Sequence, residues 1–156
     1  MDLRIITVGK PSRETHRVFV DKYVKRLRSV WPTEIVSVAA EKLTQNSNDG
    51  DVMRREAERI VAKCPVDWPI VALDRRGASI GSEDFSQRMV DWQDSGMRGV
   101  TFVIGGALGL ASEFVERAAH RLSFGPMTLP HDLALIVLTE QIYRAMTIAQ
   151  GHPYHR

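Results

Sequence analysis

The sequence has little cysteine, little net charge and no long apolar run, and each scarcity excludes a class of protein. Cys64 is the only cysteine among 156 residues, so no intrachain disulfide can form and a reducing compartment fits. No stretch approaches the roughly 18 uncharged apolar residues of a membrane span. The start, MDLRIITVGK, lacks the basic segment and long apolar core of a signal peptide. We therefore expect a cytoplasmic protein with no membrane partner.

Several familiar catalytic signatures are also missing. The sequence contains no HExxH, P-loop or GxGxxG pattern. His131, His152 and His155 could in principle hold zinc, but no carboxylate or cysteine adjoins the terminal pair to complete a ligand pattern. Cys64 lies on the apolar stripe of an expected helix and is interpreted as a core residue. No metal site is expected.

The charge is small overall but unevenly distributed. The formal net charge is +2, yet residues 10–28 hold seven basic and two acidic side chains, a local charge of +5. An excess of this kind favours an anionic partner, although a solvated helix face gives the same pattern. Lys25 and Arg26, within this stretch, are the candidate contacts for a polyanion.

Strand and helix patterns alternate along the whole chain. Apolar, β-branched runs end at glycine or turn residues, and between them apolar residues recur at three- and four-residue steps. The expected strands cover residues 3–8, 34–40, 69–74, 100–106 and 127–129. The expected helices run from Pro11-Ser12 to Val30, over 51–64, from a Ser82 cap through Trp92, from Ser112 through Leu122, and over 133–149. This order predicts a single α/β domain over residues 1–156, with a mostly parallel sheet covered by helices on both faces.

Two of the expected helices carry apolar residues in different arrangements. The first helix has Phe19, Tyr23, Leu27 and Val30 on one stripe. The last helix has apolar residues on more than one side, including Leu133, Ile136, Val137, Ile142 and Met146. A helix of that kind is buried on several sides. A second copy of the chain or the chain itself can cover it, and we favour a homodimer.

Two loops rich in glycine and proline could wall a pocket. FVIGGALGL (102–110) places glycines at the end of a buried strand and before a helix, where open α/β sheets bind ligands. SFGPMTLPH (123–131) bends at Gly125-Pro126 before the last helix. Either stretch alone is also what an ordinary strand–helix turn looks like.

Five stretches together resemble the RlmH family, the ribosomal RNA large-subunit methyltransferases of the SPOUT superfamily. They are VALD (71–74), FVIGGALGL (102–110), LSFGPMTLPH (122–131), LTEQIYRAMTI (138–148) and GHPYHR (151–156). The resemblance covers the chain up to its last residue. It implies methylation of N3 of a pseudouridine in 23S rRNA, with S-adenosylmethionine as cofactor and the assembled 70S ribosome as substrate. It also implies a C-terminal trefoil knot and an obligate homodimer.

The resemblance also implies a cofactor site. Its members are Leu73, Gly105, Phe124, Gly125, Pro126, Met127, Thr128 and Leu129. Adenine needs a flat apolar slot and backbone hydrogen-bond partners, and a glycine at 105 lets a ligand approach the main chain. Contacts to residues 124–126 are expected to be made by the main chain.

The terminal GHPYHR would then act on the acceptor base. The N3–H of a uracil-like ring is a weak acid, so a histidine is a credible proton acceptor. His155, Tyr154 and Arg144 are the expected catalytic residues, and His152 and Arg156 the expected substrate contacts. Two simpler interpretations stay open: Tyr154 and His152 could only anchor the tail, and Glu140 and Arg144 could be an ordinary helical ion pair. The chain could also be an RNA-binding protein without catalysis, or a nucleotide-dependent enzyme.

Overall fold

Five parallel strands form one sheet in the computed structural model, which describes residues 1–10 and 14–155. The strands are β1 (Asp2–Val8), β2 (Thr33–Val38), β3 (Ile70–Ala78), β4 (Gly99–Ile104) and β5 (His120–Leu122). Their order across the sheet is β2-β1-β4-β3-β5, and every pairing between them is parallel. The parallel α/β sheet predicted from the alternating pattern is confirmed.

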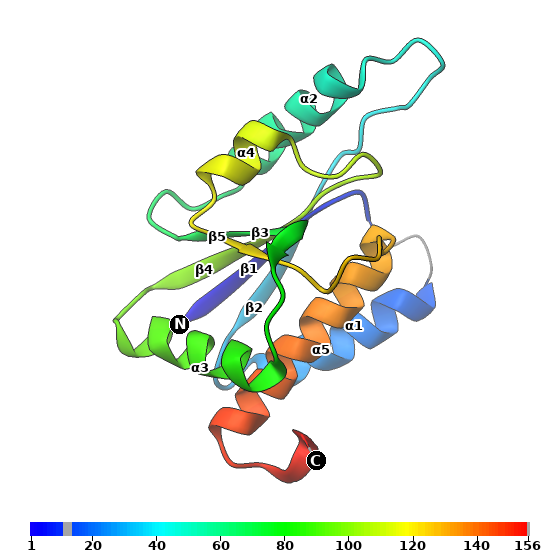
Figure 1. Cartoon of the computed structure of the whole chain (residues 1–156). Coiled ribbons are helices and arrows are strands. Elements are labelled where there is room, and N and C mark those ends of the chain that lie inside the picture. The colour runs from blue at the N-terminus through cyan, green and yellow to red at the C-terminus, as the bar shows by residue number, and fades with distance from the viewer. Residues whose placement is uncertain (11–13, 156) are drawn as a thin grey trace.

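Helices cover both faces of this sheet (Figure 1). The helices are α1 (Glu14–Leu27), α2 (Asp49–Val61), α3 (Ser82–Asp94), α4 (Ser112–Arg117) and α5 (His131–Ala149), followed by the 3-10 turn η1 (Pro153–His155). In Figure 1, α1, α3 and α5 lie on one face, and α2 and α4 on the other. Among the described residues no helix is both long and apolar enough to cross a lipid bilayer.

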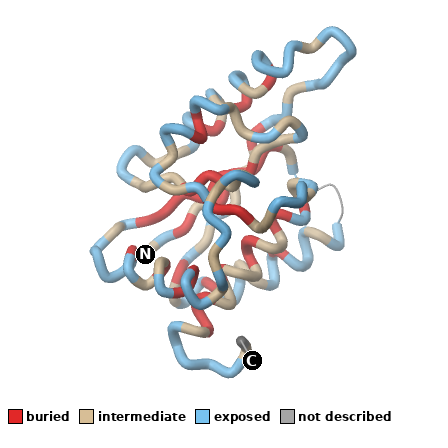
Figure 2. Tube along the Cα trace, in the orientation of Figure 1, coloured by how far each residue is buried: buried red, intermediate tan, exposed pale blue. Residues whose placement is uncertain are grey.

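Strand alternation explains why there are two cores. On β1, Leu3 and Ile5 pack into the cluster beneath α1, α3 and α5, whereas Ile6 and Val8 pack beneath α2 and α4. All six residues of β4 are buried, because this strand lies inside the sheet and is covered on both sides. Figure 2 shows the buried residues concentrated along the strands and along the sides of the helices that face them.

β3 bends around the edge strand β5. Leu73 and Ala78 both pair with Leu122, so residues 74–77 bulge out between the two pairings. The bend brings the Gly77 backbone so close to β5 that a Cβ on residue 77 would lie 2.8 Å from the backbone of Arg121 and Leu122. A segment that wraps the last strand in this way is consistent with the knotted C-terminal half that the resemblance implies.

The predicted last strand was placed wrongly. Residues 127–129 form a loop in which Met127 and Thr128 are exposed, and the strand is His120–Leu122 instead. The two prolines at 126 and 130 lack the N–H groups that a sheet ladder uses. The preceding helix ends at Arg117, because Ala118 adopts an extended ψ of 137°, so Leu122 is buried as a strand residue and not as a helical one.

Two details of the helices also differ from the sequence prediction. On α1 the buried residues are Val20 and Leu27, whereas Phe19 is 51% exposed. Ser82 does not cap α3: Gly81 precedes the helix, and the Ser82 hydroxyl instead bonds to Gln141 on α5. The predicted start of the first helix at Pro11-Ser12 lies outside the described residues. Cys64 lies just beyond the end of α2, where it is half-buried against the second core.

Candidate active site

Three of the predicted cofactor-binding positions come together at the carboxyl ends of adjacent strands. The register pairs Ala72 of β3 with Val103 of β4, and Leu73 of β3 with Leu122 of β5. Leu73 lies in β3 at the level of these pairs, and Gly105 and Phe124 follow them after β4 and β5, the two strands that flank β3. This is the edge at which open parallel sheets bind ligands.

The glycines of the turn after β4 are required by the turn itself. Gly106 accepts a hydrogen bond from the amide of Gly109, whose φ of +83° favours glycine. A Cβ on residue 105 would lie 2.6 Å from the Gly109 carbonyl carbon. The backbone of this turn therefore folds over Gly105 and leaves no room there for a side chain.

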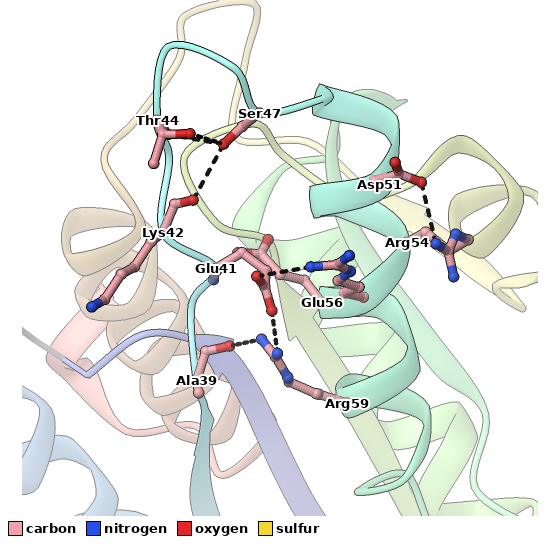
Figure 3. Close-up of polar contacts among 10 residues, drawn as sticks. Ala39, Glu41, Lys42, Thr44, Ser47, Asp51, Arg54, Glu56 and Arg59 are labelled. Carbon is pink, nitrogen blue, oxygen red and sulfur yellow. Dashed lines mark hydrogen bonds and ion pairs between the residues drawn. The ribbon is translucent and has the colours of Figure 1, made fainter.

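A buried carboxylate supports the same turn from the α2 face. Glu56 is 5% exposed, and a Cβ on Gly106 would lie 2.8 Å from its Oε2. Its Oε1 accepts a hydrogen bond from the Glu41 amide at 3.0 Å, and Arg59 bonds both to the Glu41 carboxylate and to the Ala39 carbonyl. Figure 3 shows these side chains filling the space between α2 and the segment that follows β2. The turn thus rests on a polar cluster built by two other segments.

The loop after β5 is anchored at its start and open further along. Ser123 donates to the carbonyls of Arg75 and Gly125 and accepts from the Gly125 amide. Gly125 has a φ of +116°, and Met127 is 81% exposed. In the described part of the chain, the amides of residues 127–129 have no hydrogen-bond acceptor. Three successive N–H groups are therefore available to a ligand.

Two adjoining hollows lie between the start of α3 and α5, and the smaller one reaches this loop. The inner hollow, of about 300 Å³, has Phe124 and Val137 in its walls. The outer hollow, of about 560 Å³, has Arg144 and Ile148 in its walls. Gly81, Ser82 and Gln141 line both, so the predicted cofactor loop and the predicted catalytic arginine face neighbouring parts of one surface.

The terminal segment is an ordered extension of α5. Gly151 has a φ of +66° and donates to the Ile148 carbonyl, while the His152 amide donates to Thr147. This pair of bonds is the Schellman arrangement, which reverses the chain after a helix. The reversal directs the 3-10 turn back toward α5, so the terminal segment has a defined place.

Tyr154 packs against α5 and α1 of its own chain. Its ring lies 4.8 Å from the Tyr143 ring, and the Arg144 guanidinium carbon lies 5.2 Å from its centroid. Its hydroxyl lies 3.5 Å from Glu140 Oε1. Hydrogen bonding with Tyr23, together with burial and the Glu140 charge, raises the pKa of Tyr154 to about 12. The phenol is therefore neutral at physiological pH and acts as a donor.

The predicted substrate contacts are divided by the structure. Lys25 and Arg26 are both exposed, and the Arg26 guanidinium carbon lies 5.2 Å from the Tyr143 ring centroid, beside the Tyr154 cluster. His152 accepts a hydrogen bond at Nδ1 from the Tyr154 amide, at 3.3 Å. Arg156 and the side chain of His155 lie outside the described residues. Within the described ranges, no three histidine, cysteine or acidic side chains are grouped as metal ligands would be.

Comparison with known proteins identifies the family. A family model described as a predicted SPOUT methyltransferase matches residues 1–155. A protein of Latilactobacillus sakei named ribosomal RNA large subunit methyltransferase H is 40% identical, and the match covers 100% of both chains. A protein of Rubrobacter xylanophilus with the same name is 45% identical over 86% of each chain. The chain belongs to the RlmH family of SPOUT methyltransferases.

A solved structure supports the fold of this RlmH family member. A probable methyltransferase from Bordetella pertussis superposes with a TM-score of 0.55 at 16% identity, covering 92% of this chain and 95% of the other. At this level of identity, the likeness concerns the arrangement of strands and helices. It supports the α/β fold described above.

Sequence reasoning missed four polar residues around this RlmH site. The sequence indicates Glu140 only as a helical partner of Arg144. No local pattern predicts that Ser82 and Gln141 meet, because 59 positions separate them. Glu56 lies with Val52 and Ile60 on the buried stripe of α2. The glutamate alone carries no signal of burial, since its hydrogen-bond partner lies on a distant segment.

Proposed function

We propose that this RlmH family member transfers a methyl group from S-adenosylmethionine to N3 of a pseudouridine in 23S rRNA of the assembled ribosome. The observation that carries the proposal is the loop at residues 127–129, whose amides bond to no described residue, in a chain whose full-length relatives are named as large-subunit rRNA methyltransferases. The donor site, the acceptor residues and the RNA surface are each supported by separate contacts.

The residues at the carboxyl edge fit an adenosine-containing methyl donor. Leu73, Phe124 and Leu129 are half-buried apolar side chains that offer a slot for a flat ring. The amides of Met127, Thr128 and Leu129 are available to its acceptor atoms. When bound, S-adenosylmethionine supplies a methyl group already activated by the sulfonium charge. The task left to the protein is orientation of the two reactants.

The terminal residues suit work on the acceptor base. His152, whose Nδ1 accepts from the Tyr154 amide, is proposed to contact the acceptor base. Either His155 or His152 is proposed to accept the N3 proton. The neutral Tyr154 stacks on or orients the base, and Arg144 holds a phosphate or carbonyl oxygen.

The basic face of α1 is proposed to contact rRNA phosphates. Lys25 and Arg26 belong to its exposed basic residues, and Arg26 lies beside the Tyr154 cluster. The Lys25→Glu, Arg26→Glu double variant should bind ribosomes more weakly and with a shallower dependence on salt, because fewer counterions are released. An unchanged slope of log affinity against log salt would remove this role.

A homodimer is proposed to complete the site. Phe19 and Leu133 are large apolar residues that stay 51% and 42% exposed on α1 and α5, which pack together. The 19 residues of α5 span about 28 Å, and the helix runs from the cofactor loop at one end to the terminal segment at the other. Figure 1 shows the C-terminus at the far end of α5 from that loop. In a dimer, the terminal segment of one subunit can complete the pocket of the other.

The direct test is transfer of labelled methyl to ribosomes. Incorporation into 70S ribosomes, with little into isolated subunits or naked rRNA, is the expected result. Deletion of residues 151–156 should preserve folding and donor binding and abolish methylation; transfer at the normal rate would refute the role of the terminal segment. Calorimetry with S-adenosylmethionine, NAD and ATP separates this proposal from a non-catalytic RNA-binding protein, which would bind none of them, and from a nucleotide-dependent enzyme.

A further inference from the structure

One carboxylate connects the residues proposed to act on the base. Glu140 Oε1 accepts hydrogen bonds from Arg144 Nε at 3.1 Å and Nη2 at 2.7 Å, and it faces the Tyr154 hydroxyl at 3.5 Å. Both contacts converge on a single oxygen, although Tyr154 reaches it from beyond the end of the helix. An ordinary i, i+4 ion pair would involve Arg144 alone.

The second oxygen of Glu140 leads to the two hollows. Oε2 accepts from Gln141 Nε2 at 2.7 Å, and Gln141 Oε1 accepts from the Ser82 hydroxyl at 2.7 Å. Ser82 is the first residue of α3, and both Ser82 and Gln141 line the inner and the outer hollow. A continuous chain of hydrogen bonds therefore runs from the hollow beside Phe124 to the terminal segment.

Partial burial strengthens the ion pair between Glu140 and Arg144. The side chains of Glu140 and Arg144 are only 19% and 28% exposed, so solvent screens the pair less than it would at an open surface. The hydrogen bonds that Arg144 donates to Glu140 raise the pKa of Arg144, which stays charged. In the described part of the chain, Arg144 Nη1 has no acceptor and remains available to a ligand in the outer hollow.

We propose that Glu140 is a positioning residue that fixes Arg144 and Tyr154 relative to the hollow lined by Ser82 and Gln141. The inference rests on the proposed function, because it takes Arg144 and Tyr154 to act on the acceptor base. Glu140 itself bonds to both groups through one oxygen and, through Gln141, connects their positions to Ser82 of α3. Loss of its charge releases the arginine and the terminal segment together, whereas the loop at 127–129 is untouched.

The test compares Glu140→Gln with Glu58→Gln. Glu58 pairs with Arg54 at i, i+4 on α2, at 3.0 Å, so its variant breaks the same kind of bond at an exposed place outside the site. Glu140→Gln should lower the single-turnover methylation rate of 70S ribosomes about ten- to a hundredfold, as misplacement of reacting groups does. Its dissociation constant for S-adenosylmethionine should stay within about twofold of wild type. Glu58→Gln should match wild type in both.

Two further measurements report position directly. Hydrogen exchange of the amides at residues 151–155 should accelerate in Glu140→Gln and not in Glu58→Gln. The rate losses of Glu140→Gln and Tyr154→Phe should be less than additive in the double variant, since both remove one interaction. A rate loss with unchanged exchange and additive effects would overturn the inference, because Glu140 would then act in another way.

The two proposals fail separately. If deletion of residues 151–156 abolishes methylation but Glu140→Gln methylates at the wild-type rate, the positioning role is overturned and the proposed function stands. If the deletion leaves methylation intact, the proposed role of the terminal segment is wrong, and the positioning role of Glu140 is overturned with it.

Discussion

Replacement of Gly105 by alanine should destabilise the fold before it affects any ligand. The added Cβ would lie 2.6 Å from the Gly109 carbonyl carbon and 2.8 Å from both the Gly109 oxygen and the Leu110 nitrogen. Ordinary contact begins at 3.4 Å, and all three atoms belong to the backbone of a turn closed by the Gly106–Gly109 bridge. The added methyl group would force the turn open, as in an overpacked core, and should lower the free energy of unfolding by about 1–3 kcal/mol.

The expected cost can be measured as a melting temperature. For a chain of this size, each kcal/mol corresponds to about 2–4 °C, so Gly105→Ala should melt about 2–12 °C below wild type. Circular dichroism at one fixed protein concentration is the assay, since association would shift the midpoint. Ala107→Ser is the matched control, because it adds one atom to an exposed position of the same turn and should melt like wild type.

The outcome also decides between two reasons for the glycine. A Gly105→Ala protein that melts like wild type but binds S-adenosylmethionine weakly would refute the steric reasoning. It would show that ligand approach alone requires a glycine there. A lowered midpoint without ligand would show that the turn requires it in every state.

Three more predictions concern single side chains. Burial lowers the pKa of His120, with a smaller effect of Arg88, so the folded state binds a proton at His120 less tightly than the unfolded state does. The contribution of His120 to the free energy of unfolding is therefore complete above pH 6.5 and is lost as the pH falls. Denaturation between pH 7 and 5 should therefore show a steeper loss for wild type than for His120→Phe, and equal slopes would contradict this. The raised pKa of Tyr154 means that its contribution is complete below about pH 10 and is lost as the pH rises toward 12. Alkaline absorbance titration should lose its last step in Tyr154→Phe, and persistence of that step would assign it to another tyrosine. Ser86 donates to the Ala145 carbonyl at 2.7 Å in the core, so Ser86→Ala should unfold about 0.5–1.5 kcal/mol more easily in guanidinium, and an unchanged midpoint would show that the bond contributes nothing.

Local patterns in the sequence predict most of the fold. Strand β4 and helix α5 carry long apolar runs whose type and approximate bounds follow from composition and period alone. The end of α4 and the position of β5 do not follow, because a three-residue edge strand has too few residues to show a period. Its place is set by the pairing of Leu122 with Leu73 and Ala78, which are remote in the sequence.

The site could be predicted in part. The loops at 105–110 and 123–131 are marked by glycine and proline, and the family resemblance assigns them a ligand. The hydrogen bonds from Ser82 to Gln141 and from Tyr154 to Glu140 are not visible in any local pattern. They depend on how α3 and the terminal segment dock against α5, and docking is decided by the packing of the whole core.

The Schellman reversal at Gly151 makes the terminal segment a rigid arm of α5. The amide bonds of Gly151 and His152 fix the arm to the last helical turn, and the ring contact with Tyr143 fixes its tip. A change in the tilt of α5 would therefore move Tyr154 together with the helix. A molecule that binds the exposed side of α5 and tilts it would also shift the last residues of the chain.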